Sequence, residues 1–271
     1  MGRSWMIASG KGGVGKSTIA AALGTGLARE GRRVCVVDAD IGLRDQDAIL
    51  GVENRIVYDL VDVANKECLL NQALISPEGQ ENLTLLPAAQ FARAKELEPK
   101  AFRKILRQLK EMNDEVLIDC PAGIERSLRG LMNSDVDETI VICTPDDVCI
   151  RNAERVCGLM EQKRLPRPQL IVNRLNPALI EYGDMYAAQV VAQVLDLSLL
   201  GEVPEEPMIY RALLAHMNVL DVACEGREAL VRIARRMKGE DIPLPCYGTT
   251  VLPWYRRLFR PKHKEVKRID C

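Results

Sequence analysis

No apolar run in this 271-residue sequence approaches the ~20 residues that a membrane-spanning helix needs. The first residues, MGRSWMIAS, enter a predicted strand directly and lack the regions of a signal peptide. The chain also lacks internal repeats and low-complexity blocks. Because 47% of the residues are apolar and 28% are charged, we expect a well-packed cytoplasmic protein.

The nine cysteines include no C-x-x-C pair, and their number is odd. Several lie within apolar runs such as VCVVD and ETIVIC, which is typical of small buried side chains in a reducing compartment. We therefore expect neither a disulfide framework nor a cysteine-ligated metal.

Charge is distributed unevenly along the chain. Residues 254–271 contain seven Lys/Arg and two Asp/Glu, a net charge of +5. Since the whole chain carries −1, residues 1–253 carry −6. A mildly acidic body is thus followed by a basic tail.

Short apolar, β-branched runs alternate with helical patterns through the body of the chain. Runs without polar alternation predict strands that are covered on both faces, as in a parallel sheet. We therefore predict an α/β fold with a single doubly wound, mostly parallel sheet. The predicted strands are 4–9, 33–40, 82–88, 115–123, 138–145, 168–177 and 197–204, and the predicted helices are 17–31, 99–112, 151–164, 207–217 and 226–239.

The stretch SGKGGVGKST satisfies the phosphate-binding pattern G-x-x-x-x-G-K-[ST] between a strand and a helix. Glycines let backbone N–H groups wrap phosphates, the helix N-terminus adds its dipole, and Ser17 can ligate Mg²⁺. The predicted phosphate-binding residues are Gly10, Lys11, Gly12, Gly13, Val14, Gly15, Lys16, Ser17 and Thr18.

The same glycines also satisfy G-x-G-x-x-G, with Asp38 at the distance of a ribose-binding acid. A nicotinamide dinucleotide oxidoreductase is therefore the competing interpretation, and a ligand-free glycine-rich connection is a third. The trio Lys16-Ser17-Thr18 and the later acid Asp119 favour a mononucleotide site, because a dinucleotide loop has no use for them.

Three strand-end acids complete the predicted site. Asp38 and Asp119 each end a buried strand, where they can support Mg²⁺ together with Ser17, and Asp40 can orient the attacking water. A solvated acidic turn is the alternative for Asp40. We predict Lys11, Lys16 and Asp40 as the catalytic residues.

K-G-G-x-G-K-[ST], with its early Lys11, resembles the deviant Walker A (SIMIBI-type) P-loop ATPases. Within that superfamily the chain is similar to the MinD family from about residue 3 to residue 240 and again in the tail. The similar stretches are VVDADIGL, VYDLVDV, LNQALI, NLTLLPAAQ, DCPAGIE, YGDM and LIVNRLNP.

This resemblance implies an ATPase with ATP and Mg²⁺ as ligands and an ATP-dependent homodimer. In the family the early lysine reaches the partner subunit's phosphates, so Lys11 would contact the ATP of the other subunit; the alternative is that it folds back on its own. The resemblance also implies that Asn173, Arg174 and Pro204 contact adenine.

The tail contains LPWYRRLFRPKHK, in which Trp254, Tyr255, Leu258 and Phe259 would share one face of a short helix. With Arg257 and its basic neighbours, this pattern is typical of a segment at an anionic membrane surface. Docking on the chain's own domain and binding to nucleic acid are the alternatives. We predict an ATPase domain over 1–239, a linker over 240–251 and a membrane-targeting tail over 252–271.

By resemblance we expect a division-site-selection ATPase, peripheral on the inner face of the cell membrane. Its partners would be a MinC-like septum inhibitor and a MinE-like or other regulator, and no nucleic acid is expected. A ParA-like partition ATPase that binds DNA through its basic tail is the alternative.

Overall fold

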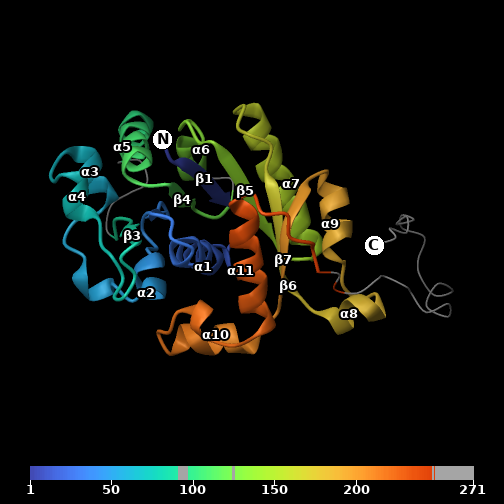
Figure 1. The fold of residues 1–271 in the computed structure, drawn as a ribbon. Coiled ribbons are helices and arrows are strands. Elements are labelled where there is room, and N and C mark those ends of the chain that lie inside the picture. Colours follow the sequence, from blue (N-terminus) through green and yellow to red (C-terminus); the bar gives the residue numbers. More distant parts are fainter. Residues whose placement is uncertain (91–96, 124–125, 246, 248–271) are drawn as a thin grey trace.

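A computed structural model describes residues 1–90, 97–123, 126–245 and 247 of the chain, without the side chains of Arg126, Ser127 and Arg129. In this part the strands form one parallel sheet of seven, in the order β3-β2-β4-β1-β5-β6-β7 (Figure 1). The strands are β1 (Arg3–Ala8), β2 (Val34–Asp38), β3 (Leu83–Leu86), β4 (Glu115–Asp119), β5 (Glu138–Cys143), β6 (Gln169–Leu175) and β7 (Ser198–Pro204).

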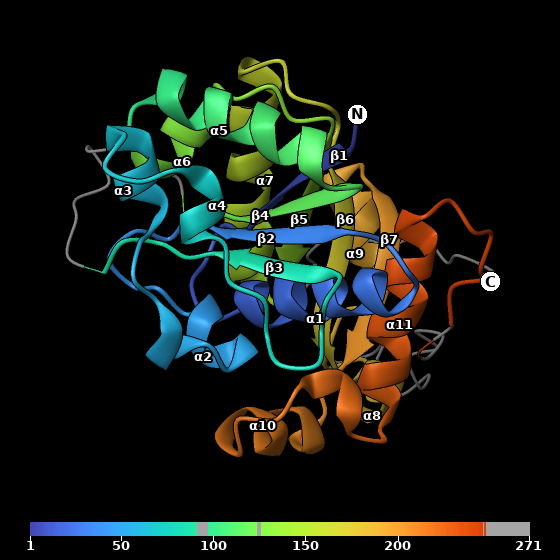
Figure 2. The ribbon, with the colours of Figure 1, turned by 60° about the vertical axis from the view of Figure 1, so that its left-hand side comes forward.

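Helices cover both faces of the sheet, and the layers are seen in Figure 2. On one face α1 (Lys16–Arg29) packs against β2 and β4 and contacts α11 (Glu225–Met237), which lies on β7. On the other face α5 (Pro99–Met112) lies against β4, α7 (Asp147–Gln162) against β5, and α9 (Ala188–Leu195) against β6 and β7. This arrangement confirms the doubly wound parallel fold that the sequence predicts.

Shorter elements fill the connections. They are α2 (Gln46–Leu50), η1 (Glu53–Arg55), α3 (Leu60–Asn65), α4 (Leu70–Ala73), α6 (Arg126–Leu131), α8 (Pro177–Tyr182), α10 (Pro207–Leu214) and η3 (Val219–Asp221). The only one of these that the sequence analysis predicts is α10, which ends at Leu214 rather than at Met217.

The predicted helix over 151–164 begins too late, because α7 starts at Asp147. The side chain of Asp146 accepts a hydrogen bond from the Cys149 amide at 2.9 Å and so caps a helix that begins four residues before the predicted start. The predicted strand ends at 40, 123 and 177 are likewise too late, since these strands stop at Asp38, Asp119 and Leu175 and the chain turns into loops.

The sheet order places β1 between β4 and β5. After β1 the chain moves through α1 to β2 on one side of the sheet, whereas β5, β6 and β7 extend it on the other side. In open α/β sheets, ligands bind at the carboxyl ends of the strands where the order reverses in this way. The Gly10–Ser17 loop follows β1 at that point.

Candidate nucleotide site

Three of the four glycines of the loop between β1 and α1, Gly10, Gly13 and Gly15, occupy positions that disfavour a side chain. Gly13 and Gly15 have φ values of +76° and +90°, in the left-handed region. A Cβ on Gly15 would also lie 2.5 Å from Asn173 Nδ2, and one on Gly10 would lie 2.3 Å from the backbone of Asn152. The loop therefore packs closely against β6 and α7, with its backbone wound around the start of α1.

Lys16 lies at the first position of α1 and is 6% exposed. Its ammonium group is 2.5 Å from Asp119 Oδ1 and 3.4 Å from Ser17 Oγ. Burial lowers the pKa of Lys16, but the Asp119 carboxylate outweighs this effect, so the pKa is raised above the ordinary value. The lysine is thus fully charged at neutral pH.

Asp38 and Asp119 end the adjacent strands β2 and β4 and are paired in register. The Asp38 carboxylate accepts hydrogen bonds from the amides of Asp40 at 3.0 Å and Gln46 at 3.1 Å. Burial, together with the negative charge of Asp119, raises the pKa of Asp38 to about 7. Two buried carboxyl groups therefore face one site, which favours a cation between or beside them.

Gln46 joins the parts of this site, and the sequence analysis does not identify it. Its Nε2 donates to Asp119 Oδ2 at 2.8 Å and to the Ser17 carbonyl at 3.0 Å. Within the described part of the chain its buried Oε1 has no hydrogen-bond partner. The available signal is an amide residue among the acids of DADIGLRDQD, which contacts Ser17 although the two residues are 29 positions apart in sequence.

The donors at this point fit Mg²⁺. Ser17 supplies a hydroxyl, Asp38 and Asp119 supply carboxylates, and the Gln46 Oε1 atom is an unused acceptor. Hard oxygen donors suit Mg²⁺, which is bound by one or two carboxylates and completed by phosphate oxygens and water. In the described residues, no group of three or more His, Cys, Asp and Glu side chains could hold a metal ion by itself.

A hollow of about 260 Å³ lies on the outer side of the loop. Lys11 is exposed and lines it, as does Arg174, whose φ is +59°. The remaining lining residues are Gly12, Gly13, Val14, Thr144, Pro145, Asp146, Met185 and Glu205. The hollow therefore extends from the loop to the carboxyl ends of β5, β6 and β7.

Asn173 faces the loop rather than the hollow, since its Nδ2 donates to the Val14 carbonyl at 2.7 Å. Pro204 is buried at the end of β7, paired with Leu175 of β6, and the hollow is lined by its neighbour Glu205. The structure thus brings Arg174 and Lys11 to one hollow and places Asn173 and Pro204 beside it. Thr18 is half-buried in the first turn of α1.

Asp146 brings an acid to the rim near Lys11. Burial raises its pKa, but hydrogen bonds from the Thr144 hydroxyl and the Cys149 amide, together with the charge of Lys11, hold the pKa below its usual value.

Asp40 is half-buried, and its charge contributes to the raised pKa of Lys16. The tail residues Trp254, Tyr255, Arg257, Leu258 and Phe259 lie outside the described residues.

Comparison with known proteins identifies the family. The matching family model is ParA, described as NUBPL iron-transfer P-loop NTPase, and it covers residues 1–237. The septum site-determining protein MinD of Bacillus subtilis is 41% identical over 248 residues, which span 90% of this chain and 92% of that protein. The chain belongs to the MinD family. Because MinD and ParA proteins are P-loop ATPases, it is an ATPase, and the dinucleotide interpretation is set aside.

Solved structures of MinD proteins share the fold. The MinC:MinD cell division protein complex of Aquifex aeolicus contains a chain with 35% identity and a TM-score of 0.84, covering 91% of this chain and 99% of that one. The Pyrococcus horikoshii MinD complexed with Mg-ADP has 28% identity and a TM-score of 0.76, covering 88% and 96%. In the described residues of this MinD-family chain, no helix is long and apolar enough to cross a membrane.

Proposed function

We propose that this chain is a Mg·ATP-dependent, dimerising ATPase of bacterial division-site selection that binds the membrane reversibly through its tail. One observation carries the proposal beyond the family assignment. The two lysines of the loop have different surroundings, because Lys16 is buried against Asp119 whereas Lys11 is exposed at the rim of the hollow. A lysine at the rim is accessible to the phosphates of a second subunit.

A cation supplied by the partner makes the γ-phosphate part of the contact between subunits. ATP would then join two copies of the chain, and hydrolysis would release them. This explains why the loop contains two lysines: Lys16 binds the phosphates of its own subunit, and Lys11 binds those of the other.

The residues around Lys16 are suited to phosphoryl transfer. Ser17, Asp38 and Asp119 would hold Mg²⁺, which neutralises charge on the phosphate oxygens. Asp40 follows β2 next to this group and would orient the attacking water. Asn173, Arg174 and Pro204 would hold the adenine at the β6 and β7 end of the hollow.

Membrane binding is assigned to Trp254, Tyr255, Arg257, Leu258 and Phe259. Each basic residue near an anionic surface contributes roughly 1 kcal/mol, and two turns of helix bury little apolar area, so one tail binds weakly. Two tails on one dimer gain avidity of about 10²-fold or more. Nucleotide-dependent dimerisation therefore controls membrane association.

The partner classes follow from the relatives. A MinC:MinD complex is known from Aquifex aeolicus, which supports a MinC-like septum inhibitor as the partner of the ATP-bound dimer. We assign the stimulation of slow hydrolysis, and hence release from the membrane, to a MinE-like or other regulatory partner. Nucleic acid has no part in this scheme.

The test is co-sedimentation of the full-length chain and of residues 1–250 with anionic vesicles, in the presence of ATP or ADP. We expect vesicle binding only for the full-length chain with ATP. In parallel, DNA binding is measured over a series of salt concentrations. ATP-dependent DNA binding without vesicle binding would instead indicate the ParA-like partition function suggested by the basic tail.

A further inference from the structure

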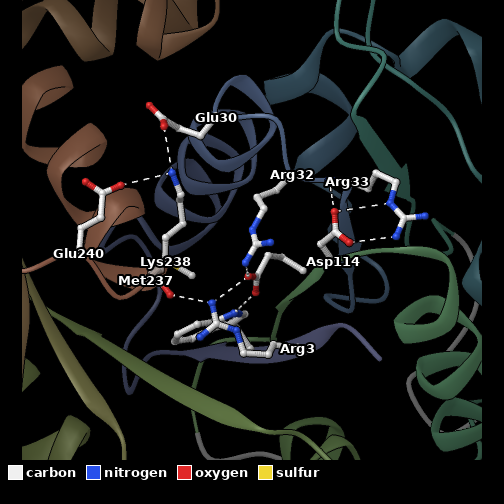
Figure 3. Close-up of polar contacts among 10 residues, drawn as sticks. Arg3, Glu30, Arg32, Arg33, Asp114, Met237, Lys238 and Glu240 are labelled. Carbon is white, nitrogen blue, oxygen red and sulfur yellow. Dashed lines mark hydrogen bonds and ion pairs between the residues drawn. The ribbon is translucent and has the colours of Figure 1, made fainter.

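The C-terminal end of α11 lies close to the amino end of β1 and to the end of α1, and Figure 3 shows the polar contacts that join them. Arg3 Nη2, at the start of β1, donates to the Met237 carbonyl at 2.8 Å. Lys238 Nζ lies 3.0 Å from Glu30 at the end of α1 and 3.3 Å from Glu240. The C-terminal end of α11 is therefore fixed at the end of the sheet opposite to the phosphate loop.

Residues 240–247, here called the strap, then run back along α11; the structure describes all of them except Cys246. Arg236 donates from Nε to the Ile242 carbonyl at 2.8 Å and from Nη2 to the Pro243 carbonyl at 2.6 Å. The first part of the strap is thus bound to the last turn of α11. The proline-rich composition of the strap does not predict these contacts.

The far end of the strap is held at the beginning of α11. Arg232 Nη2 donates to the Tyr247 hydroxyl at 3.3 Å, and that hydroxyl bonds in turn to Glu225. Tyr247 is only 8% exposed. Because later strap residues contact earlier residues of α11, the strap runs antiparallel to the helix and carries the chain back toward the carboxyl ends of the strands.

The strap also lies against the edge of the sheet. Arg236 Nη1 donates to the Leu200 carbonyl of the edge strand β7 at 3.1 Å, so one guanidinium joins the edge strand to the strap. Next to it, a Cβ on Gly201 would lie 2.2 Å from Ile233 Cγ1, which shows how closely α11 approaches β7. An unpaired strand edge is thereby partly covered.

We propose that the strap sets the point at which the membrane-binding tail leaves the domain, and that it places this point on the nucleotide side of the sheet. The inference rests on the proposed function, in which two subunits meet across their nucleotide sites. With the strap docked, both tails start near that interface. With the strap released, each tail would start at Gly239, displaced by the length of α11, about 20 Å for its 13 residues.

The expected size of the effect follows from linker length. Six residues separate Tyr247 from Trp254, whereas fourteen separate Gly239 from Trp254. Effective concentration falls as about the −3/2 power of the length of a flexible linker, so release of the strap should weaken dimer avidity roughly three- to fourfold. The affinity of a single tail for lipid should not change.

The experiment compares the full-length chain with Arg236→Ala and Tyr247→Ala, which remove the contacts at the two ends of the strap. Leu244→Ala is the matched control, because Leu244 belongs to the same segment but is exposed. Amide hydrogen exchange over 240–247 reports docking of the strap. Sedimentation with vesicles of phosphatidylglycerol and phosphatidylcholine, with ATP or ADP, reports binding, and nucleotide affinity checks that the site is intact.

We expect both anchor variants, but not the control, to lose exchange protection and to bind ATP-loaded vesicles three- to fourfold more weakly. Tyr247→Ala leaves the contact between Arg236 and Leu200 in place. An effect of this variant therefore comes from the strap and not from the edge strand. Loss of protection with unchanged vesicle binding would overturn the proposal, as would an unprotected strap in the unaltered chain. If the unaltered chain bound vesicles equally with ATP and ADP, the proposed function would fail instead, while the exchange data would still decide whether the strap is docked.

Discussion

The ammonium group of Lys16 lies 2.5 Å from the carboxylate of Asp119, with both side chains almost fully buried. This ion pair joins the phosphate loop to β4 and balances one of two adjacent buried carboxyl groups, the other being Asp38. The geometry predicts two roles for Lys16, in ligand binding and in stability. Both can be measured.

Replacing Lys16 with alanine should abolish nucleotide binding, measured by calorimetry. The same change leaves Asp119 buried without its cation, so the free energy of unfolding in urea should fall by about 3 kcal/mol. Lys104→Ala is the control, since this exposed lysine of α5 lies outside the loop and the site. Tight ATP binding by Lys16→Ala would contradict the assignment of the loop.

Asp40→Ala should retain ATP and still dimerise, because Asp40 is assigned to the attacking water rather than to binding. The hydrolysis rate in single-turnover experiments should fall by about 10²-fold or more, the contribution typical of a positioned carboxylate. Asp45→Ala, in the same acidic stretch, should hydrolyse normally. An unchanged rate for Asp40→Ala would remove Asp40 from catalysis and leave it as part of a solvated turn.

Trp254→Glu should bind ATP and dimerise as before but lose vesicle association, because a carboxylate on the predicted apolar face opposes burial in the headgroup region. Sedimentation with ATP measures this directly. Lys267→Glu, outside the aromatic segment, provides a control for charge and should weaken binding only modestly. Equal loss in both variants would mean that net charge, not the apolar face, determines membrane binding.

The sequence predicts the fold well wherever long buried runs or long amphipathic helices occur. All seven strands of the described sheet and the bounds of α5 are predicted, because the apolar patterns extend over several residues. Helices such as α2, α3 and α8 are missed since they have only five or six residues, too few for a full apolar period. The capping box of Asp59 and Asp62 was a usable local signal for α3.

The candidate site likewise contains residues that the sequence predicts and residues that it does not. Motif spacing predicts the positions of Lys16, Asp38 and Asp119, which the fold brings together at adjacent strand ends. Gln46 is missed because its partners are distant in sequence, and no spacing rule relates a glutamine to a loop 29 residues away. Composition predicts a linker over 240–251, and no pattern in it reveals that Arg236 binds backbone carbonyls of that segment.

Strap docking should depend on pH through Glu202 of β7. This residue is 2% exposed, and within the described residues its Oε2 has no hydrogen-bond partner. Burial raises its pKa to about 7, against the opposing effects of Arg236, Gln189 and Arg232. The charge of Glu202 also helps to raise the pKa of the Tyr247 hydroxyl, which bonds to Glu225.

The buried acid retains its proton to a higher pH than an exposed glutamate, whose pKa is about 4.3. The stability of the docked state therefore falls as the pH rises from about 4.3 to about 7, and it is constant above that pH. Hydrogen exchange of the strap, corrected for intrinsic rates, should therefore show a smaller opening free energy at pH 7.5 than at pH 5.5. Glu202→Gln should remove this difference. A pH dependence that persists in Glu202→Gln would assign it to another group.

The central claim is that ATP joins two identical chains through Lys11. Light scattering on the full-length chain with Mg²⁺ measures it most directly. We predict a dimer with ATP in the slowly hydrolysing Asp40→Ala background, a monomer with ADP, and a monomer with either nucleotide when Lys11→Ala is added. A monomer in every nucleotide state, or an ATP-dependent dimer that persists without Lys11, would contradict the account.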